Sequence, residues 1–260
     1  KGGVGKTTSM VNVGVALAHE GRRVLMLDAD LGLANVDVLL GIKPRATLYD
    51  LLEGRRSIQE IIIPGPDGVS IIPAASGVET MCNLTPLQHR ALLEAVEEVA
   101  QDYDYLLIDT QAGISSDVMY FNAAASEVVC VINGEPTSLT DAYALIKVLA
   151  TRYGEKEISI LVNNVPDEIS AKRAFDRLAK VVERYLALSP EFLGWVPTDA
   201  DIRESIRQQD AAVRLFPSSK ISMAYAKLAR SIDEQFFQGR IKGGMQLFFK
   251  QLLEVGAYGR

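Results

Sequence analysis

Short runs of apolar, often β-branched residues recur along the chain, separated by longer stretches in which apolar positions repeat every three to four residues. Most of the short runs are continuously apolar, which is typical of parallel strands covered on both faces. The runs that we predict to be strands are 23–27, 69–73, 105–109, 127–132, 158–162 and 192–196.

The longer stretches have the period of amphipathic helices. The predicted helices are 86–103, 138–153, 171–188 and 219–237. Their regular alternation with strands predicts an α/β fold with a doubly wound, mostly parallel sheet and helices on both faces. We expect one domain over residues 1–238, since no repeat or long polar linker divides it.

Composition and charge favour some classes of protein over others. The 260 residues are 48% apolar and 23% charged, as in soluble globular proteins, and the net charge of −6 argues against a surface that mainly coats nucleic acid. Cys82 and Cys130 lack metal-ligand spacing and are expected to be buried or inert thiols. No apolar run is long enough to cross a bilayer, so we expect a cytoplasmic protein.

The chain opens with a glycine-rich loop. Lys1-Gly2-Gly3-Val4-Gly5-Lys6-Thr7-Thr8 leads directly into a helical pattern at 9–20, and a strand that feeds the loop is expected upstream of Lys1. Glycines let backbone N–H groups turn around a phosphate while the helix points its positive end at the same place. Lys6 would reach the β- and γ-phosphates, and the Thr7 hydroxyl would bind Mg²⁺.

Aspartates follow two of the predicted strands. Asp28 and Asp30 end one strand, and Asp109 ends another. The carboxyl ends of parallel strands face the ligand crevice, and phosphoryl transfer needs carboxylates to hold Mg²⁺ and to position water. The alternative is that these aspartates cap the helices that follow them.

These motifs resemble those of the MinD/ParA ATPases. Residues 1–7 resemble the deviant Walker A loop of that family, in which Lys1 matches the signature lysine. Residues 28–32 (DADLG) resemble its switch I, and residues 109–114 (DTQAGI) its Walker B and switch II. Two further strings, 32–41 (GLANVDVLLG) and 135–147 (EPTSLTDAYALIK), are most similar to the flagellar-number regulators called FlhG or FleN.

The resemblance implies a role for each matching residue. Lys6 and Lys1 would neutralise phosphate charge, with Lys1 reaching the nucleotide of a second copy of the chain. Thr7 would bind Mg²⁺, Asp109 would hold it through a water, and Asp28 would support the metal shell. Asp30 would orient the hydrolytic water, and the backbone of the loop would bind phosphate through Gly2, Gly3, Val4, Gly5, Lys6, Thr7 and Thr8.

The resemblance also implies contacts with the nucleoside. Asn163 and Pro197 match adenine contacts, with Asp199 beside them, and Arg203 is a weaker candidate near the base. Glu135 matches a ribose contact made from the facing subunit. Gln111 departs from the family, which usually has a small residue or proline there, so the hydrolysis rate is left open.

The implied activity is a slow ATPase that converts ATP and water to ADP and phosphate. Two Mg²⁺–ATP groups facing each other across a homodimer would need the exchanged lysines to offset their repulsion, and hydrolysis would loosen the dimer. Family partners are a flagellar SRP-type GTPase, an AAA+ flagellar transcription activator and basal-body switch proteins. The alternatives are a ParA-like DNA-partitioning ATPase and a nucleotide-gated scaffold in which hydrolysis hardly matters.

The last twenty-odd residues form a separate pattern. After glycines at 239, 243 and 244, the helical period places Met245, Phe248, Phe249, Leu252 and Val255 on one face, with basic residues nearby. Such a helix, over 239–260, can lie in an anionic membrane surface, most firmly when a dimer presents two copies. It can also pack on the core of its own chain, and both readings stay open. His19 and His89 are expected to be surface or cap residues.

Overall fold

The computed structural model describes residues 2–81 and 84–237, so Lys1, Cys82 and the helix predicted in 239–260 lie outside the described residues. The chain divides into two compact units. The β1–β4 unit comprises residues 7–111 and 201–230, and the β5–β7 unit comprises residues 2–6, 112–200 and 231–237. Each unit is therefore assembled from stretches that are far apart in the sequence.

The β1–β4 unit is built on a sheet with the strand order β2-β3-β1-β4. Its strands are β1 (Val24–Ala29), β2 (Ile63–Pro64), β3 (Ser70–Ile72) and β4 (Tyr105–Thr110). Strand β1 runs parallel to both β3 and β4, while β2 pairs antiparallel with β3. The register of β1 and β4 places Asp28 directly opposite Asp109.

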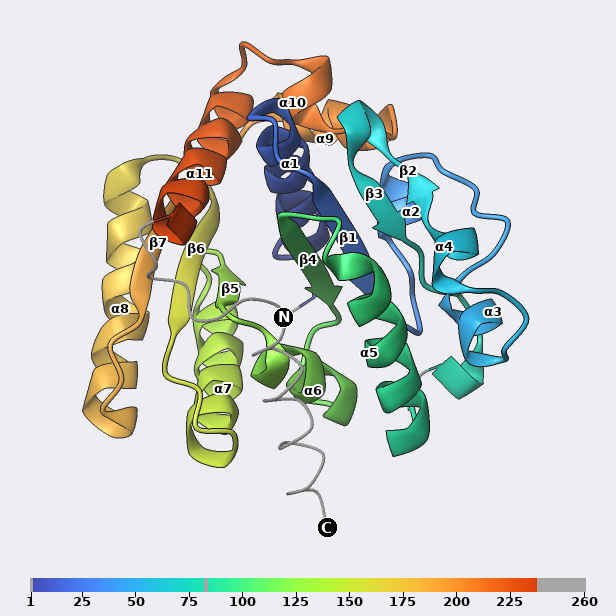
Figure 1. Ribbon diagram of the computed structural model, residues 1–260. Coiled ribbons are helices and arrows are strands. Elements are labelled where there is room, and N and C mark those ends of the chain that lie inside the picture. The colour runs from blue at the N-terminus through green and yellow to red at the C-terminus, as the bar shows by residue number, and fades with distance from the viewer. Residues whose placement is uncertain (1, 82–83, 238–260) are drawn as a thin grey trace. The chain divides into compact units, whose positions relative to one another are not determined.

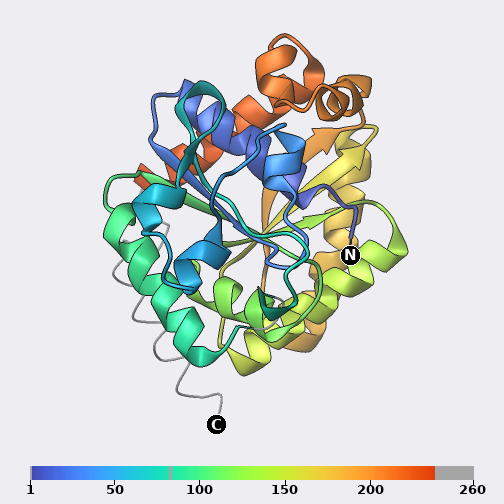
Figure 2. The same cartoon turned by 90° about the vertical axis from the view of Figure 1, so that its right-hand side faces the viewer.

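Helices make up much of the rest of the β1–β4 unit. They are α1 (Lys6–His19), which begins one residue before the unit, α2 (Val36–Leu39), α3 (Leu48–Leu52), α4 (Ile58–Ile61), α5 (Pro86–Ala100), α9 (Ala200–Arg207), α10 (Ala212–Leu215) and the larger part of α11 (Lys220–Phe237), with 3₁₀ turns η1 (Pro66–Gly68) and η2 (Glu79–Met81). Figure 2 shows α5 beside the short helices α3 and α4, which contact it. Helix α1 packs closely on the sheet at Gly14. A Cβ at this position would fall only 2.2 Å from Met26 Cε on β1.

The β5–β7 unit has a parallel sheet with the order β5-β6-β7. Its elements are α6 (Ser116–Ala124), β5 (Val128–Ile132), α7 (Pro136–Arg152), β6 (Ile158–Val165), α8 (Glu168–Leu186) and β7 (Glu191–Pro197), together with the end of α11. Helices α7 and α8 lie side by side against the sheet (Figure 1). Ile146, Ile160, Val162 and Val182 are among the fully buried residues of the core that they enclose.

The mostly parallel α/β fold is confirmed, and each predicted strand and long helix is present within a few residues of its predicted ends. Cys130 is buried, and His19 is an exposed residue at the end of α1. The prediction for His89 is wrong: it is buried in α5 because it shares the inner face of that helix with Leu92, Leu93 and Val96. Within the described ranges, no helix is long and apolar enough to span a membrane.

Candidate nucleotide site

The glycine loop has the backbone shape that its residues predict. Gly3 and Gly5 have φ values of +79° and +89°, which L side chains rarely adopt, while Val4 between them is buried. Asn163, near the end of β6, donates a hydrogen bond from Nδ2 to the Val4 carbonyl oxygen at 2.8 Å. A Cβ at Gly5 would lie only 2.3 Å from the same Nδ2, so any other residue there would displace this amide from the Val4 carbonyl.

Helix α1 begins at Lys6, directly after the loop, so its first turn carries Lys6, Thr7 and Thr8. These three side chains are all partly exposed. The first turn contains no acidic residue, which leaves the positive end of the helix available to an anion. The loop and the helix start therefore have the features of a phosphate-binding element.

The side chains of Thr7 and Asp109 are hydrogen-bonded to each other within the β1–β4 unit. The Thr7 hydroxyl donates to Asp109 Oδ2 at 2.5 Å, and Asp109 is buried at the end of β4. A hydroxyl and a carboxylate are oxygen ligands of the kind that Mg²⁺ takes in NTPase sites, where substrate phosphates complete the shell. The residues present therefore fit Mg²⁺ bound together with a nucleotide.

The Asp28 carboxylate accepts hydrogen bonds from three backbone N–H groups, an arrangement that we call the Asp28 clasp. Its Oδ2 accepts hydrogen bonds from the N–H groups of Asn35 at 2.9 Å and Val36 at 3.1 Å, and its Oδ1 accepts one from Asp30 N–H at 3.1 Å. Val36 is the first residue of α2, so the capping alternative is observed for Asp28. The clasp also fixes the backbone of Asp30, whose Oδ1 accepts from Leu33 N–H at 3.3 Å.

Burial sets the protonation of Asp28. Desolvation raises its pKa to about 7, the hydrogen bonds from Val36, Asn35 and Asp30 oppose this rise, and the nearby charge of Asp109 adds to it. Between its ordinary pKa of 3.8 and about 7, the folded chain holds a proton on Asp28 that the unfolded chain has lost. The contribution of Asp28 to stability therefore falls as pH rises through that window.

We expect the ligand-free chain, kept in a chelator, to be less stable at about pH 8 than at about pH 6 by about 1 kcal/mol on account of Asp28. Urea unfolding at both pH values measures this difference. In Asp28→Asn, which stays neutral throughout, the difference should shrink by that amount. Equal pH dependence in the two proteins would contradict the raised pKa.

The residues predicted to contact the nucleoside divide between the two units. In the β5–β7 unit, Asn163 and Pro197 lie at the carboxyl ends of β6 and β7, where Val165 pairs with Pro197. Asp199 follows β7, and Glu135 is the exposed N-cap of α7, with its N–H bonded to Asn133 Oδ1. Arg203 is exposed on α9 in the β1–β4 unit, and Gln111 directly follows β4.

Asn12 is a supporting residue that sequence reasoning missed. It is buried in α1, donates from Nδ2 to the Thr8 carbonyl at 2.8 Å, and accepts from Val213 N–H at the start of α10 at 3.1 Å. These bonds fix the first turns of α1 beside Thr7. The available signal was an amide on the otherwise apolar face of that helix.

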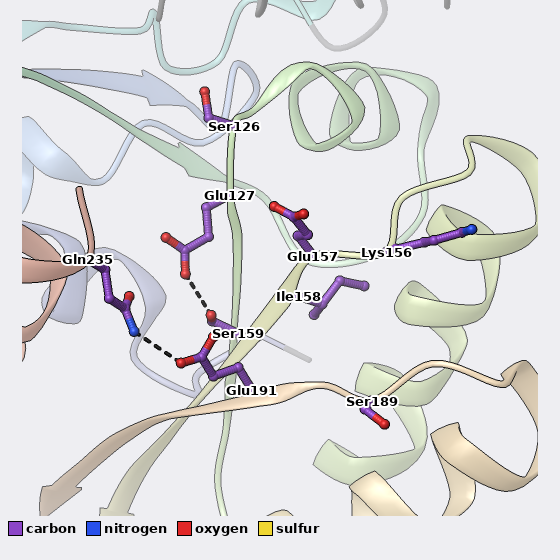
Figure 3. Close-up of a pocket in the computed structure, with 9 residues that line it drawn as sticks. All are labelled: Ser126, Glu127, Lys156, Glu157, Ile158, Ser159, Ser189, Glu191 and Gln235. Carbon is purple, nitrogen blue, oxygen red and sulfur yellow. Dashed lines mark hydrogen bonds between the residues drawn. The ribbon is translucent and has the colours of Figure 1, made fainter. Parts of the chain in front are cut away.

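A pocket of the β5–β7 unit lies at the other end of its sheet. It is lined by Glu127, Ser159 and Glu191, at or just before the amino ends of β5, β6 and β7 (Figure 3). Burial raises the pKa of Glu127, whose Oε1 accepts from the Ser159 hydroxyl. Because nucleotides bind at the carboxyl ends of parallel strands, this pocket is separate from the predicted site.

Comparisons with known proteins extend the similarity beyond these motifs. A family model described as "AAA domain" matches residues 1–160. The antiactivator FleN of Pseudomonas aeruginosa is 42% identical over 259 residues, which cover 100% of this chain and 92% of that protein. The flagellum site-determining protein YlxH of Helicobacter pylori is 31% identical, covering 98% and 87%. The solved structure of the septum site-determining protein MinD complexed with Mg-ADP, from Pyrococcus horikoshii, has a TM-score of 0.76 at 30% identity and covers 94% of this chain and 96% of that one.

Proposed function

The chain belongs to the MinD and FleN family of P-loop ATPases, whose cofactors are ATP and Mg²⁺, and from that premise we propose that it is a dimerising switch that regulates flagellar number or placement. In this proposal, ATP joins two copies of the chain and hydrolysis separates them. The observation that carries the proposal is the Thr7–Asp109 hydrogen bond next to the glycine loop. The flagellar role is supported by the names of the relatives.

In this proposal, each residue of the site has a separate role in ATP hydrolysis. The backbone of residues 2–8 binds phosphate oxygens, and the Lys6 ammonium neutralises the charge that develops on the leaving phosphates. Thr7 and Asp109 would hold Mg²⁺, and Asp28 would support that metal site. Mg²⁺ supplies charge neutralisation when bound. Asp30, whose backbone the Asp28 clasp fixes, orients the attacking water.

Charge explains why ATP would join two copies. Two triphosphates that face each other repel, and Lys1 of each copy offsets this by reaching the nucleotide of the other. Glu135, exposed at the start of α7, contacts the ribose across the same interface, while Asn163, Pro197, Asp199 and Arg203 serve the base. Loss of the γ-phosphate releases the switch segments, so the dimer loosens.

Membrane attachment follows the same cycle. Residues 239–260 bind the inner membrane surface peripherally in the ATP state, because two copies bind more firmly than one. ADP returns the chain to the cytoplasm. The proposed partners are the flagellar SRP-type GTPase, the AAA+ transcription activator and the basal-body switch proteins.

Gel filtration with and without ATP and Mg²⁺ tests the switch. We expect the wild type to shift from monomer to dimer in ATP and Lys1→Ala to remain a monomer, because the exchanged ammonium is gone. Lys43→Ala, which removes an exposed lysine of the β1–β4 unit, is the matched control and should shift like the wild type. A wild-type elution volume that ATP does not change would refute the switch.

Asp30→Ala separates a switch from a nucleotide-gated scaffold in the same assay. A switch that hydrolysis releases should stay dimeric for much longer in this variant once free ATP is removed. In a scaffold that does not depend on hydrolysis, the dimer would have the same lifetime in both proteins.

A further inference from the structure

The outward face of α8 carries four exposed cations, Arg173, Arg177, Lys180 and Arg184, which we call the basic stripe. At 100° per residue they fall within an arc of about 60°, and they extend over about 16 Å of the helix. The opposite face of α8, which includes Ala171, Leu178 and Val182, is buried in the core. The stripe therefore takes no part in packing the unit.

The ion pair that the structure places on α8 lies outside the basic stripe. On the same helix, Lys172 pairs with Glu168 at 2.7 Å. By contrast, the described residues provide no salt bridge to any of the four stripe cations, although Asp167 lies near Arg173. The exposed carboxylates of Asp176 and Glu183 border one edge of the stripe, so on a chain with a net charge of −6 the four cations still outnumber the acidic groups beside them.

Apolar surface borders one side of the basic stripe. Val181 and Tyr185, one helical turn apart, are 40% and 63% exposed. The Arg184 guanidinium lies over the Tyr185 ring, 5.4 Å from its centroid. Cations beside an exposed aliphatic side chain and a tyrosine are the combination that favours the headgroup region of a membrane.

The end of the described chain contacts the amino end of β7. Gln235, close to the end of α11, donates to Glu191 Oε1 at 3.1 Å, and both line a pocket with Ser189, three residues after α8 (Figure 3). Ser189 in turn hydrogen-bonds Glu183 in the last turn of α8 at 3.4 Å. The described chain therefore ends beside the amino ends of the strands, which is also the end of the unit at which α8 terminates.

We propose that the basic stripe is a second contact with an anionic lipid surface, made when residues 239–260 attach the chain to a membrane. This inference rests on the membrane attachment in the proposed function. Attachment at the end of the unit where α8 terminates brings α8 toward the lipid surface, where its cations attract anionic headgroups and Tyr185 reaches the interface. The apolar border and the position of the tail favour lipid over nucleic acid as the occupant.

Vesicle co-sedimentation of the full chain with ATP and Mg²⁺ tests this contact. The variant Arg177→Gln/Lys180→Gln removes the middle of the stripe from an exposed surface, so folding should be unaffected, as circular dichroism would verify. We expect its partitioning onto phosphatidylglycerol-containing vesicles to fall on the order of tenfold, since each cation near the surface contributes to the attraction. The control Lys43→Gln/Arg45→Gln has the same net charge and should partition like the wild type.

The outcomes separate this inference from the proposed function. If the wild type binds vesicles and the stripe variant binds equally well, the stripe contact is refuted and attachment by the tail stands. If the wild type does not bind vesicles, both membrane proposals fail, while the ATP-dependent dimer is still decided by gel filtration. A stripe variant that loses affinity for short duplex DNA, but not for vesicles, would identify nucleic acid as the occupant and overturn the proposal.

Discussion

Thr7→Val should lower ATP turnover by about 100-fold or more while the protein stays folded. Valine has nearly the same shape as threonine but lacks the hydroxyl that donates to Asp109 Oδ2 and that we propose as a ligand of Mg²⁺. The loss should fall on turnover and on the Mg²⁺ concentration needed for half-maximal rate. A steady-state phosphate-release assay with a Mg²⁺ titration measures both.

A second threonine provides the control for this substitution. Thr151 lies exposed on α7, where its hydroxyl donates to the Lys147 carbonyl at 2.7 Å, so Thr151→Val removes a comparable helix hydroxyl without touching the proposed site. Its turnover should match that of the wild type. Thr7→Val with normal turnover and normal Mg²⁺ dependence would exclude Thr7 as a metal ligand.

Gly5→Ala should weaken ATP binding on the order of 100-fold. The φ of +89° costs an L residue about 1–3 kcal/mol, and the new Cβ would lie 2.3 Å from Asn163 Nδ2, so the loop or the Asn163 side chain must move and the Asn163–Val4 hydrogen bond must break. Since backbone N–H groups of this loop are the proposed phosphate ligands, their displacement costs affinity. Binding of a fluorescent ATP analogue measures the change.

Gly54→Ala separates backbone strain from the clash. Gly54 also has a positive φ, of +68°, but nothing lies within 4 Å of a Cβ there. This variant should lose about 1 kcal/mol of unfolding free energy and keep its ATP affinity. If Gly5→Ala binds ATP as tightly as the wild type, the loop shape described above is not the one that holds phosphate.

The strands and the main polar groups of the candidate site could be predicted because each depends on local signals. Continuous apolar runs mark buried parallel strands, and the carboxyl ends of such strands face the ligand crevice, which is why Asp28 and Asp109 were expected at that edge, where the structure pairs them in register. The glycine loop could be predicted because glycines followed directly by Lys6 and Thr7 are typical of one backbone arrangement, a phosphate-binding loop that leads into a helix. These features do not depend on how distant segments fold.

Other features depend on contacts that the sequence pattern does not encode. Helix α8 begins at Glu168 rather than at 171, because the Asp167 side chain caps it through Ser170 N–H before the apolar period starts. Helices α2, α3 and α4 have only four or five residues, too few to show a period. The Asp28 clasp depends on the path of residues 30–36, which brings the amides of Asn35 and Val36 back to the end of β1.

The interleaved chain path of the two units constrains how a ribosome can produce this fold. The β1–β4 unit needs residues 201–230, which leave the exit tunnel only after the whole 112–200 stretch of the other unit. Its long-range bonds, such as Val213 to Asn12 and Tyr225 to Ser9, join residues 201 and 216 positions apart. Domains usually fold one after another during synthesis, whereas here α1 must wait, incompletely covered, for residues 201–230.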